Sequence, residues 1–277
     1  MGLGGVLENI VADVIFLAIL TVSGTALVVV TRWQTRARLL RFLGCRSDTP
    51  LLFVFFSTLV VKQFGSMGFD GVARSYSGPA VPQAEYLLSR TISDAIEFPS
   101  RGLFTRLLVL AIQHIPWDRT KRWLGPQEVE VRYELSHLQV PVPLPAAATI
   151  CLGSPGYNYV TDTYLSTLNP LLAFGPGSNP GIVDEKGTLI TYAGDVGMLQ
   201  RLHRNDGFPV YIAAGLGVNG TRGALKYLFA SWRKLEKRFR TGDFALALGF
   251  PCFQNDPFGS ERGVELAAFS RQEEMRI

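Results

Sequence analysis

The chain has 277 residues, of which 47% are hydrophobic and 18% charged, and its formal net charge is +4. Because the apolar excess is concentrated in one early segment, the composition excludes a multi-span channel. The basic residues are dispersed except in residues 32–46 and 233–240, and neither run is a nucleic-acid signature. Cys45, Cys151 and Cys252 match no disulfide framework or zinc motif, so we expect a reducing compartment and no metal site.

Residues 10–30 predict one membrane-spanning helix. Asp13 is their single charged residue, and about 20 residues rising ~1.5 Å each suffice to cross ~30 Å of hydrocarbon. No Lys or Arg precedes the segment, whereas arginines follow from Arg32 onward, so the positive-inside rule places the N-terminus outside. A cleaved signal peptide and a buried soluble helix are the alternatives.

We therefore expect a single-pass membrane protein with the lipid bilayer as a partner and its C-terminal domain in the cytoplasm. The linker after the span has amphipathic helical spacing, which fits either a helix on the membrane surface or a continuation of the anchor. The expected divisions are an N-terminal tail and transmembrane helix at residues 1–31, a basic juxtamembrane linker at 32–50 and a Rossmann-like domain at 51–277.

Beyond the linker, apolar strands alternate with helical patterns. This alternation predicts an α/β, Rossmann-like fold with a mainly parallel sheet and helices on both faces. The expected strands cover residues 52–58, 128–134, 148–152, 188–192, 209–214 and 243–249. The expected helices cover residues 82–97, 102–115, 161–168, 195–204 and 221–240, and a loop is expected at 175–186.

Ligands bind such sheets at the carboxyl ends of strands, and the first loop with a suitable composition follows the strand at residues 148–152. It contains Gly153, Ser154 and Asn158, with Thr161 at the start of the next helix. The small residues permit close backbone approach. The polar side chains fit either a helix cap or a contact to a phosphate or ribose at the positive helix end.

The second loop has the GxGxxG spacing between a strand and a helix. Its glycines are Gly215, Gly217 and Gly220, and Asn219 and Thr221 add polar side chains. No acidic residue ends the following strand, and the loop lies near the end of the chain instead of in the first βαβ unit. A phosphate or ribose contact is therefore favoured over a dinucleotide, and no cofactor is predicted.

Charged residues around a small-residue turn form a third group. Asp70 and Arg74 precede the turn, and Glu85 lies on the helix after it. In the functional interpretation, Arg74 would neutralise the charge of a bound phosphate. A solvated ion-pair network of the three is the alternative. Asp195 begins an expected helix, where it is most simply an N-cap and secondarily a ligand contact.

The segment SGPAVPQAE, residues 77–85, together with GTRGA, residues 220–224, resembles the nucleoside deoxyribosyltransferase-like and related nucleotide-sensing Rossmannoid families. Their members carry a GP turn, an acidic residue on the next helix and a later GT element, so the resemblance implies a nucleotide-shaped pocket. In the transferases a nucleophilic glutamate follows the threonine by three residues, and here that position is Ala224, which puts glycosidic chemistry in doubt. Membrane-tethered domains of this sort look like components of bacterial defence and signalling systems, by fold-level analogy.

Three functions remain open on the sequence. The leading hypothesis is a membrane-anchored sensor that binds a nucleotide or nucleotide-derived ligand, with self-association into a homo-oligomer as a possible response. The second is a nucleoside or glycosyl hydrolase or transferase that uses Glu85, Asp70 or Asp195 as acid or base. The third is a membrane-tethered interaction module that uses the basic face of the expected helix at residues 221–240.

Overall fold

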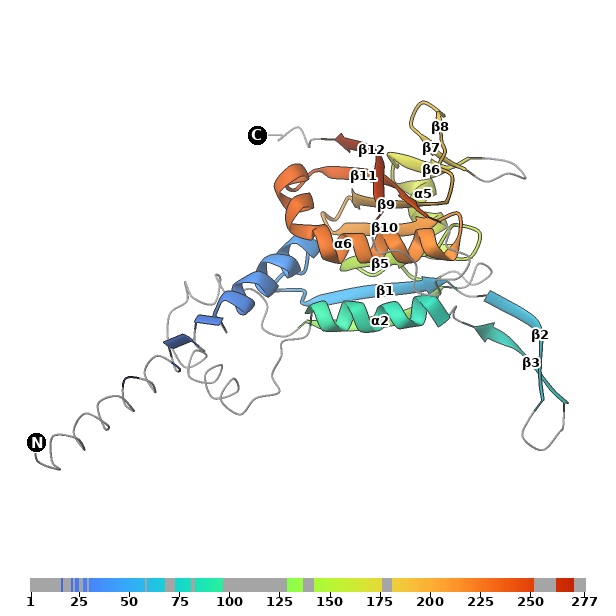
Figure 1. Ribbon diagram of the computed structural model, residues 1–277, viewed down its shortest axis with the longest axis horizontal. Coiled ribbons are helices and arrows are strands. Elements are labelled where there is room, and N and C mark those ends of the chain that lie inside the picture. The colour runs from blue at the N-terminus through green and yellow to red at the C-terminus, as the bar shows by residue number, and fades with distance from the viewer. Residues whose placement is uncertain are drawn as a thin grey trace, which may run out of the picture.

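The protein is built around a seven-stranded mixed sheet with the strand order β12-β11-β9-β10-β5-β1-β4 (Figure 1). The computed structural model describes isolated positions between residues 16 and 30, and then residues 31–57, 59–67, 73–80, 83–96, 129–136, 142–175, 181–251 and 263–271. Side chains are described for these residues except 59–67, 73–80 and 83–87.

One half of the sheet is parallel. It comprises β4 (Glu130–Ser136), β1 (Leu51–Ser57), β5 (Ala148–Leu152) and β10 (Pro209–Gly215), paired in that order. The uninterrupted apolar run of β1 is typical of a strand buried on both faces, and six of its seven residues are buried. The expected strands at 52–58, 148–152 and 209–214 therefore correspond to β1, β5 and β10.

The other half of the sheet is antiparallel. It comprises β9 (Asp195–His203), β11 (Asp243–Phe250) and β12 (Val264–Arg271), and β9 also pairs antiparallel with β10. The prediction of a mainly parallel sheet is therefore wrong. Its cause is the segment expected as a helix at residues 195–204, which is β9 instead. A short turn joins β9 to β10, and a parallel pair would have needed a crossover of a dozen residues or more.

Helices cover one face of the sheet. They are residues 30–43, α2 (Gln83–Ile96) and α6 (Val218–Phe239), whose apolar sides share one core with the sheet. In Figure 1, α2 and α6 lie side by side, and they are in contact. The two expected helices at residues 82–97 and 221–240 match α2 and α6, whereas the one expected at 102–115 lies outside the described residues.

The opposite face carries a second core. It is covered by α5 (Tyr159–Thr167) and by a small antiparallel sheet of β6 (Leu172–Phe174), β7 (Ile182–Asp184) and β8 (Leu189–Ile190). Strand β7 lies inside the segment expected to be a loop.

Strands β2 (Leu59–Met67) and β3 (Ala73–Ala80) form a separate antiparallel ribbon (Figure 1). Pro79 pairs with Val60 in its register, so the expected small-residue turn is part of a strand.

No helix in the part of the chain that the structure describes is long and apolar enough to cross a membrane. The predictions of a transmembrane helix and of a single-pass membrane localisation are corrected on this finding. Most of the predicted span, residues 10–30, lies outside the described residues. Within the continuously described helical residues 30–43, four arginines interrupt the apolar residues.

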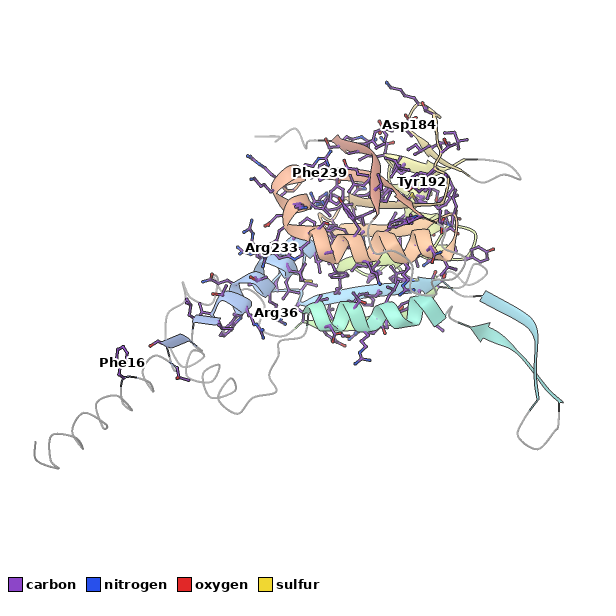
Figure 2. All side chains as sticks on the ribbon, viewed as in Figure 1. Phe16, Arg36, Asp184, Tyr192, Arg233 and Phe239 are labelled. Carbon is purple, nitrogen blue, oxygen red and sulfur yellow. The ribbon has the colours of Figure 1, made fainter. Side chains whose placement is uncertain are left out.

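The apolar side of helix 30–43 packs into the sheet core. Leu40 and Leu43 are fully buried, and Phe42 is nearly so. Arg38 forms an ion pair of 2.7 Å with Glu236, which joins the helix to α6. Figure 2 shows labelled Arg36 at the same end of the molecule, where its Nε donates to the carbonyl of Ile96 at 2.6 Å. This helix thereby forms one wall at the end of the sheet.

Candidate functional site

Asn158 is the N-cap of α5, and its side chain is completely buried. Its Oδ1 accepts from the backbone N–H of Thr161 at 3.0 Å, and its Nδ2 donates to the carbonyls of Leu152 and Phe55 at 2.8 and 3.2 Å. The side chain therefore ties the ends of β5 and β1 to the helix. Of the two interpretations open for this loop, the structure shows the helix cap.

Two further N–H groups of this region are also bonded within the protein. The N–H of Val160 donates to Ser136 Oγ at 2.9 Å, and the N–H of Gly153 donates to the carbonyl of Ala213 at 3.0 Å. The Ser154 carbonyl accepts from the next turn of the chain. Because the N–H groups of Val160 and Thr161 already have acceptors, they are not available to bind a phosphate at this helix N-terminus.

A carboxylate of the protein itself occupies the N-terminus of α6. Asp195 Oδ1 accepts from the N–H of Gly217 at 2.9 Å, and its Oδ2 accepts from the N–H of Gly220 at 2.6 Å. A negative charge here is stabilised by the helix dipole. Asp195 thus caps a helix distant in sequence, and it takes the place that a bound phosphate would need.

The glycine spacing of this loop is explained by close packing of α6 on the sheet. A Cβ at Gly215 would lie 2.5 Å from the backbone N of Thr221, and one at Gly220 would lie 2.6 Å from the carbonyl oxygen of Val196. The Thr221 side chain is itself buried. The glycines therefore allow β9, β10 and the first turn of α6 to approach one another.

Four predicted site residues remain: Asn219, Arg74, Glu85 and Asp70. Asn219 is half-buried in the first turn of α6. Arg74 is in β3 and Glu85 in α2, where only the backbone is described, and Asp70 lies outside the described residues. The predicted residues whose side chains are described therefore belong to two helix N-termini, both capped from within the protein.

A cavity of about 870 Å³ opens at the opposite end of the sheet. Strand β9 runs from one end of the sheet to the other, from Asp195 at the glycine loop to His203 at the cavity. At ~3.3 Å per residue, these two residues are roughly 26 Å apart. The walls of the cavity come from the end of helix 30–43 with the loop after it and from the end of α6, and strand residues provide its floor. Six cationic side chains line it: Arg38, Arg41, Arg46, Arg201, Lys237 and Arg240.

Most of these charges have no carboxylate partner in the described part of the chain. Arg38 pairs with Glu236, the one acidic residue among the described lining residues. Arg46 donates to the carbonyl of Gly207 at 2.8 Å, and its guanidinium lies 4.4 Å from the ring centre of Phe208. Like charges gathered in a concave surface raise the local concentration of anions.

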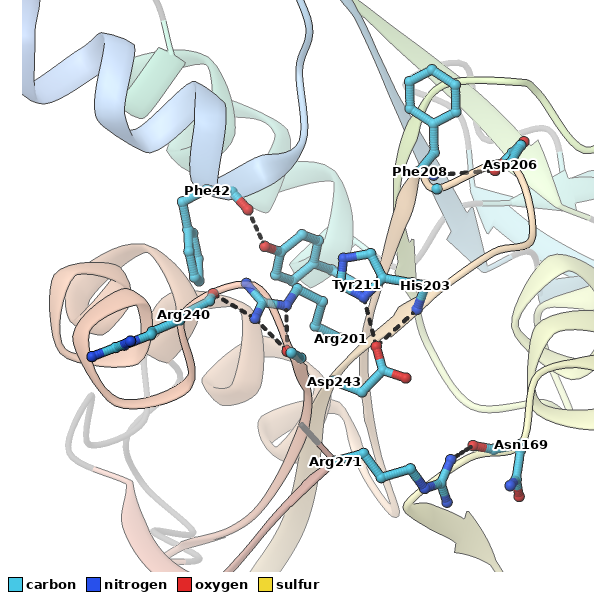
Figure 3. Close-up of polar contacts among 12 residues, drawn as sticks. Phe42, Asn169, Arg201, His203, Asp206, Phe208, Tyr211, Arg240, Asp243 and Arg271 are labelled. Atoms are coloured by element: carbon cyan, nitrogen blue, oxygen red, sulfur yellow. Dashed lines mark hydrogen bonds and ion pairs between the residues drawn. The ribbon is translucent and has the colours of Figure 1, made fainter. Parts of the chain in front are cut away.

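Arg201 is buried at the floor of the cavity with 2% of its surface exposed. Its guanidinium donates to the carbonyl oxygens of Gly242 and Arg240, as Figure 3 shows for Arg240. It also lies between two aromatic rings, 5.3 Å from the centre of Phe42 and 5.0 Å from that of Phe244. Backbone carbonyl dipoles and aromatic faces therefore surround this guanidinium in place of an acidic side chain.

Arg240 ends α6 with φ at 49° and ψ at −121°. It is the one non-glycine residue with positive φ in the part of the chain that the structure describes. Such a backbone conformation favours glycine and costs of order 1–3 kcal/mol for other residues. An exposed arginine kept in this conformation places a sixth cation at the cavity.

His203 and Asp243 form a bonded pair at the edge of the cavity (Figure 3). The Nδ1 of His203 lies 2.6 Å from Asp243 Oδ1, which also accepts from the His203 backbone N–H at 3.0 Å. Both side chains are about one-fifth exposed. This arrangement fixes the imidazole with Nδ1 toward the carboxylate and leaves Nε2 free of that bond.

Cys45 also lines the cavity, but it is 3% exposed. Burial raises the pKa of its thiol to about 12, an effect that the nearby Arg36 charge only partly offsets. The thiol is therefore protonated near neutral pH, and Cys45 is a poor nucleophile there.

None of the described residues that line the cavity is among the site residues predicted from the sequence, although the two basic runs of the sequence indicate them. Its cations come chiefly from the two basic runs, residues 32–46 and 233–240. Each run is visible alone, but their meeting depends on the packing of helix 30–43 against α6. No family model, curated protein or solved structure matches the chain.

We expect Asp195→Ala to lower the free energy of unfolding by about 0.5–2 kcal/mol, because two N–H groups at the start of α6 lose their acceptor. Urea denaturation followed by circular dichroism measures the change. Asp48→Ala, at an exposed loop position, is the control and should stay within about 0.5 kcal/mol of the wild type. Equal stability of the two variants would contradict the capping role.

We expect Arg240→Gly to raise the free energy of unfolding by about 0.5–1 kcal/mol, because glycine adopts positive φ without the steric cost. The Arg240 carbonyl that Arg201 binds is kept in this variant. The same urea titration measures the gain, and Lys237→Gly, in the preceding helical turn, should instead be destabilised by about 1 kcal/mol. A loss of stability in Arg240→Gly would show that its side chain supports the fold.

Proposed function

We propose that the protein binds a phosphorylated, nucleotide-like small molecule in the basic cavity. The observation that carries this proposal is the set of six cations around one cavity of about 870 Å³, with a single acidic residue among the described lining residues. Ligand sites for small molecules typically measure about 300–1,000 Å³, so the volume suits a ligand of nucleotide size.

The lining supplies suitable groups for a phosphate. Arginine guanidinium groups bind phosphate oxygens in a bidentate manner, and Arg41 and Arg240 are exposed at the cavity for this purpose. Lys237 adds a point charge, and the hydroxyls of Ser47 and Thr241 add hydrogen-bonding groups. An anion at this position would also relieve the repulsion among the cations.

This proposal places the ligand away from the glycine loops. At the start of α6, a phosphate would have to displace the Asp195 carboxylate from two N–H groups and would meet its negative charge. At the start of α5, Asn158 and Ser136 already accept from the helix. The resemblance to nucleotide-sensing families agrees with the proposed ligand class, and a signalling role remains a prediction.

Glycosidic chemistry that uses a carboxylate is less well supported, because Asp195 at the glycine loop and Glu236 at the cavity are already engaged. Both oxygens of Asp195 are engaged by backbone donors, and Glu236 is held by Arg38. A carboxylic acid or nucleophile of the kind that such chemistry needs would have to come from elsewhere in the chain.

The test is isothermal titration calorimetry of the full-length protein with ATP, chosen as a phosphorylated probe. We expect saturable binding that weakens as salt is raised from 50 to 200 mM, because exposed charges are screened. Lys237→Ala should raise the dissociation constant about fivefold, equivalent to ~1 kcal/mol for one exposed charge contact. Arg240→Gly should likewise bind more weakly while being more stable than the wild type.

The matched control is Lys234→Ala. Lys234 is exposed on the same helix α6 but does not line the cavity, so its loss changes the net charge equally. Its dissociation constant should stay within twofold of the wild type. Equal weakening of the Lys234 and Lys237 variants would indicate nonspecific attraction, and undiminished binding by both Lys237→Ala and Arg240→Gly would contradict the proposed site.

A further inference from the structure

The histidine beside the basic cavity has the surroundings of a proton-transfer group. The Asp243 carboxylate lies 2.6 Å from Nδ1 of His203, so the carboxylate orients the ring. His203 lines the cavity, whereas Asp243 lies behind it in β11. In Figure 3 the second ring nitrogen of His203 is on the side of the ring away from Asp243.

The geometry of β9 places His203 close to the cations that line the cavity. His203 and Arg201 are two residues apart on β9, so their side chains lie on the same face of the sheet. Both line the cavity, with the Arg240 backbone bonded to Arg201. A phosphoryl group held by the cavity cations would therefore be next to an oriented imidazole.

From this arrangement we infer that His203 is a catalytic acid–base residue that promotes hydrolysis of a terminal phosphoryl group bound in the basic cavity, and that Asp243 positions it. This inference rests on the proposed ligand class and adds a reaction to it. The substrates would be phosphate monoesters or nucleotides with a terminal phosphoanhydride.

The reaction needs water as its only co-reactant. Nε2 of His203 accepts a proton from a water molecule while the water oxygen forms a bond to phosphorus. The bond between phosphorus and the leaving oxygen breaks, and its electron pair remains on that oxygen. The proton on the imidazolium then passes to the leaving oxygen, which yields inorganic phosphate and the dephosphorylated compound and restores neutral His203.

The cavity residues have separate parts in this step. The guanidinium and ammonium groups stabilise negative charge on the phosphoryl oxygens as the bond to the leaving oxygen breaks. Asp243 keeps Nδ1 bonded and so keeps Nε2 available to accept the proton. Cys45, although nearby, is buried and takes no part.

The experiment measures phosphate release from ATP and from p-nitrophenyl phosphate by full-length protein, with binding of ATP measured by calorimetry on the same samples. We expect release by the wild type and a loss of about 100-fold or more in kcat for His203→Gln, the lower end for a general acid–base residue. The dissociation constant of ATP should change less than threefold. This combination separates chemistry from binding.

Asp243→Asn tests the positioning role. Its amide oxygen can still accept from the His203 backbone N–H, so we expect the variant to fold and to bind ATP, with kcat reduced about 10-fold and KM unchanged. The variant Lys234→Ala is the purification control and should keep wild-type turnover, because Lys234 is described and does not line the cavity.

The outcomes are distinguishable. ATP binding at the cavity without phosphate release from either probe would overturn the catalytic inference and leave the proposed binding function standing. Turnover unchanged by His203→Gln would overturn it as well, since the activity would then come from another group. Absence of ATP binding together with absence of turnover would contradict both proposals.

Discussion

The buried guanidinium of Arg201 is the interaction on which this end of the molecule depends. It comes from β9, donates to backbone carbonyls that follow α6, and lies between Phe42 of helix 30–43 and Phe244 of β11. One cation thereby joins four elements around the floor of the cavity. Because carbonyl dipoles and aromatic rings stabilise it, no acidic side chain is needed to balance it, and the cavity keeps its positive charge.

The two ends of the sheet consequently differ in charge. At the glycine-loop end, Asp195 neutralises the positive end of α6 with a side chain of the protein itself. At the other end, Lys237 and Arg240 lie at the C-terminus of α6. Arg240 has a positive φ, a backbone conformation that glycine would adopt at a lower energetic cost. The backbone conformation of Arg240 lowers the stability of the fold at the cavity, whereas the Asp195 cap raises it at the glycine loop. This distribution is expected if the ligand binds at the cavity.

Local pattern was enough to predict β1, β5, β10, β11, α2 and α6, because each is a long apolar or amphipathic run. The pattern of residues 195–204 predicts a helix and not strand β9, although the Asp206–Gly207 dipeptide before β10 is a hairpin signal and Gly207 has φ of 75°. The GxGxxG spacing predicts a phosphate or ribose contact, because sequence alone does not show that the distant Asp195 carboxylate caps this loop. The two basic runs are far apart in the sequence, and only tertiary packing of residues 30–43 on the core brings them together.

Hydrogen–deuterium exchange of the protein with and without saturating ATP tests whether the basic cavity is the binding site. If the basic cavity holds the ligand, exchange slows at the amides of residues 44–47 and 240–242, which border the cavity, and is unchanged at residues 217–221. Protection confined to residues 217–221 would place the ligand at the glycine loop and contradict the central claim that the basic cavity is the binding site.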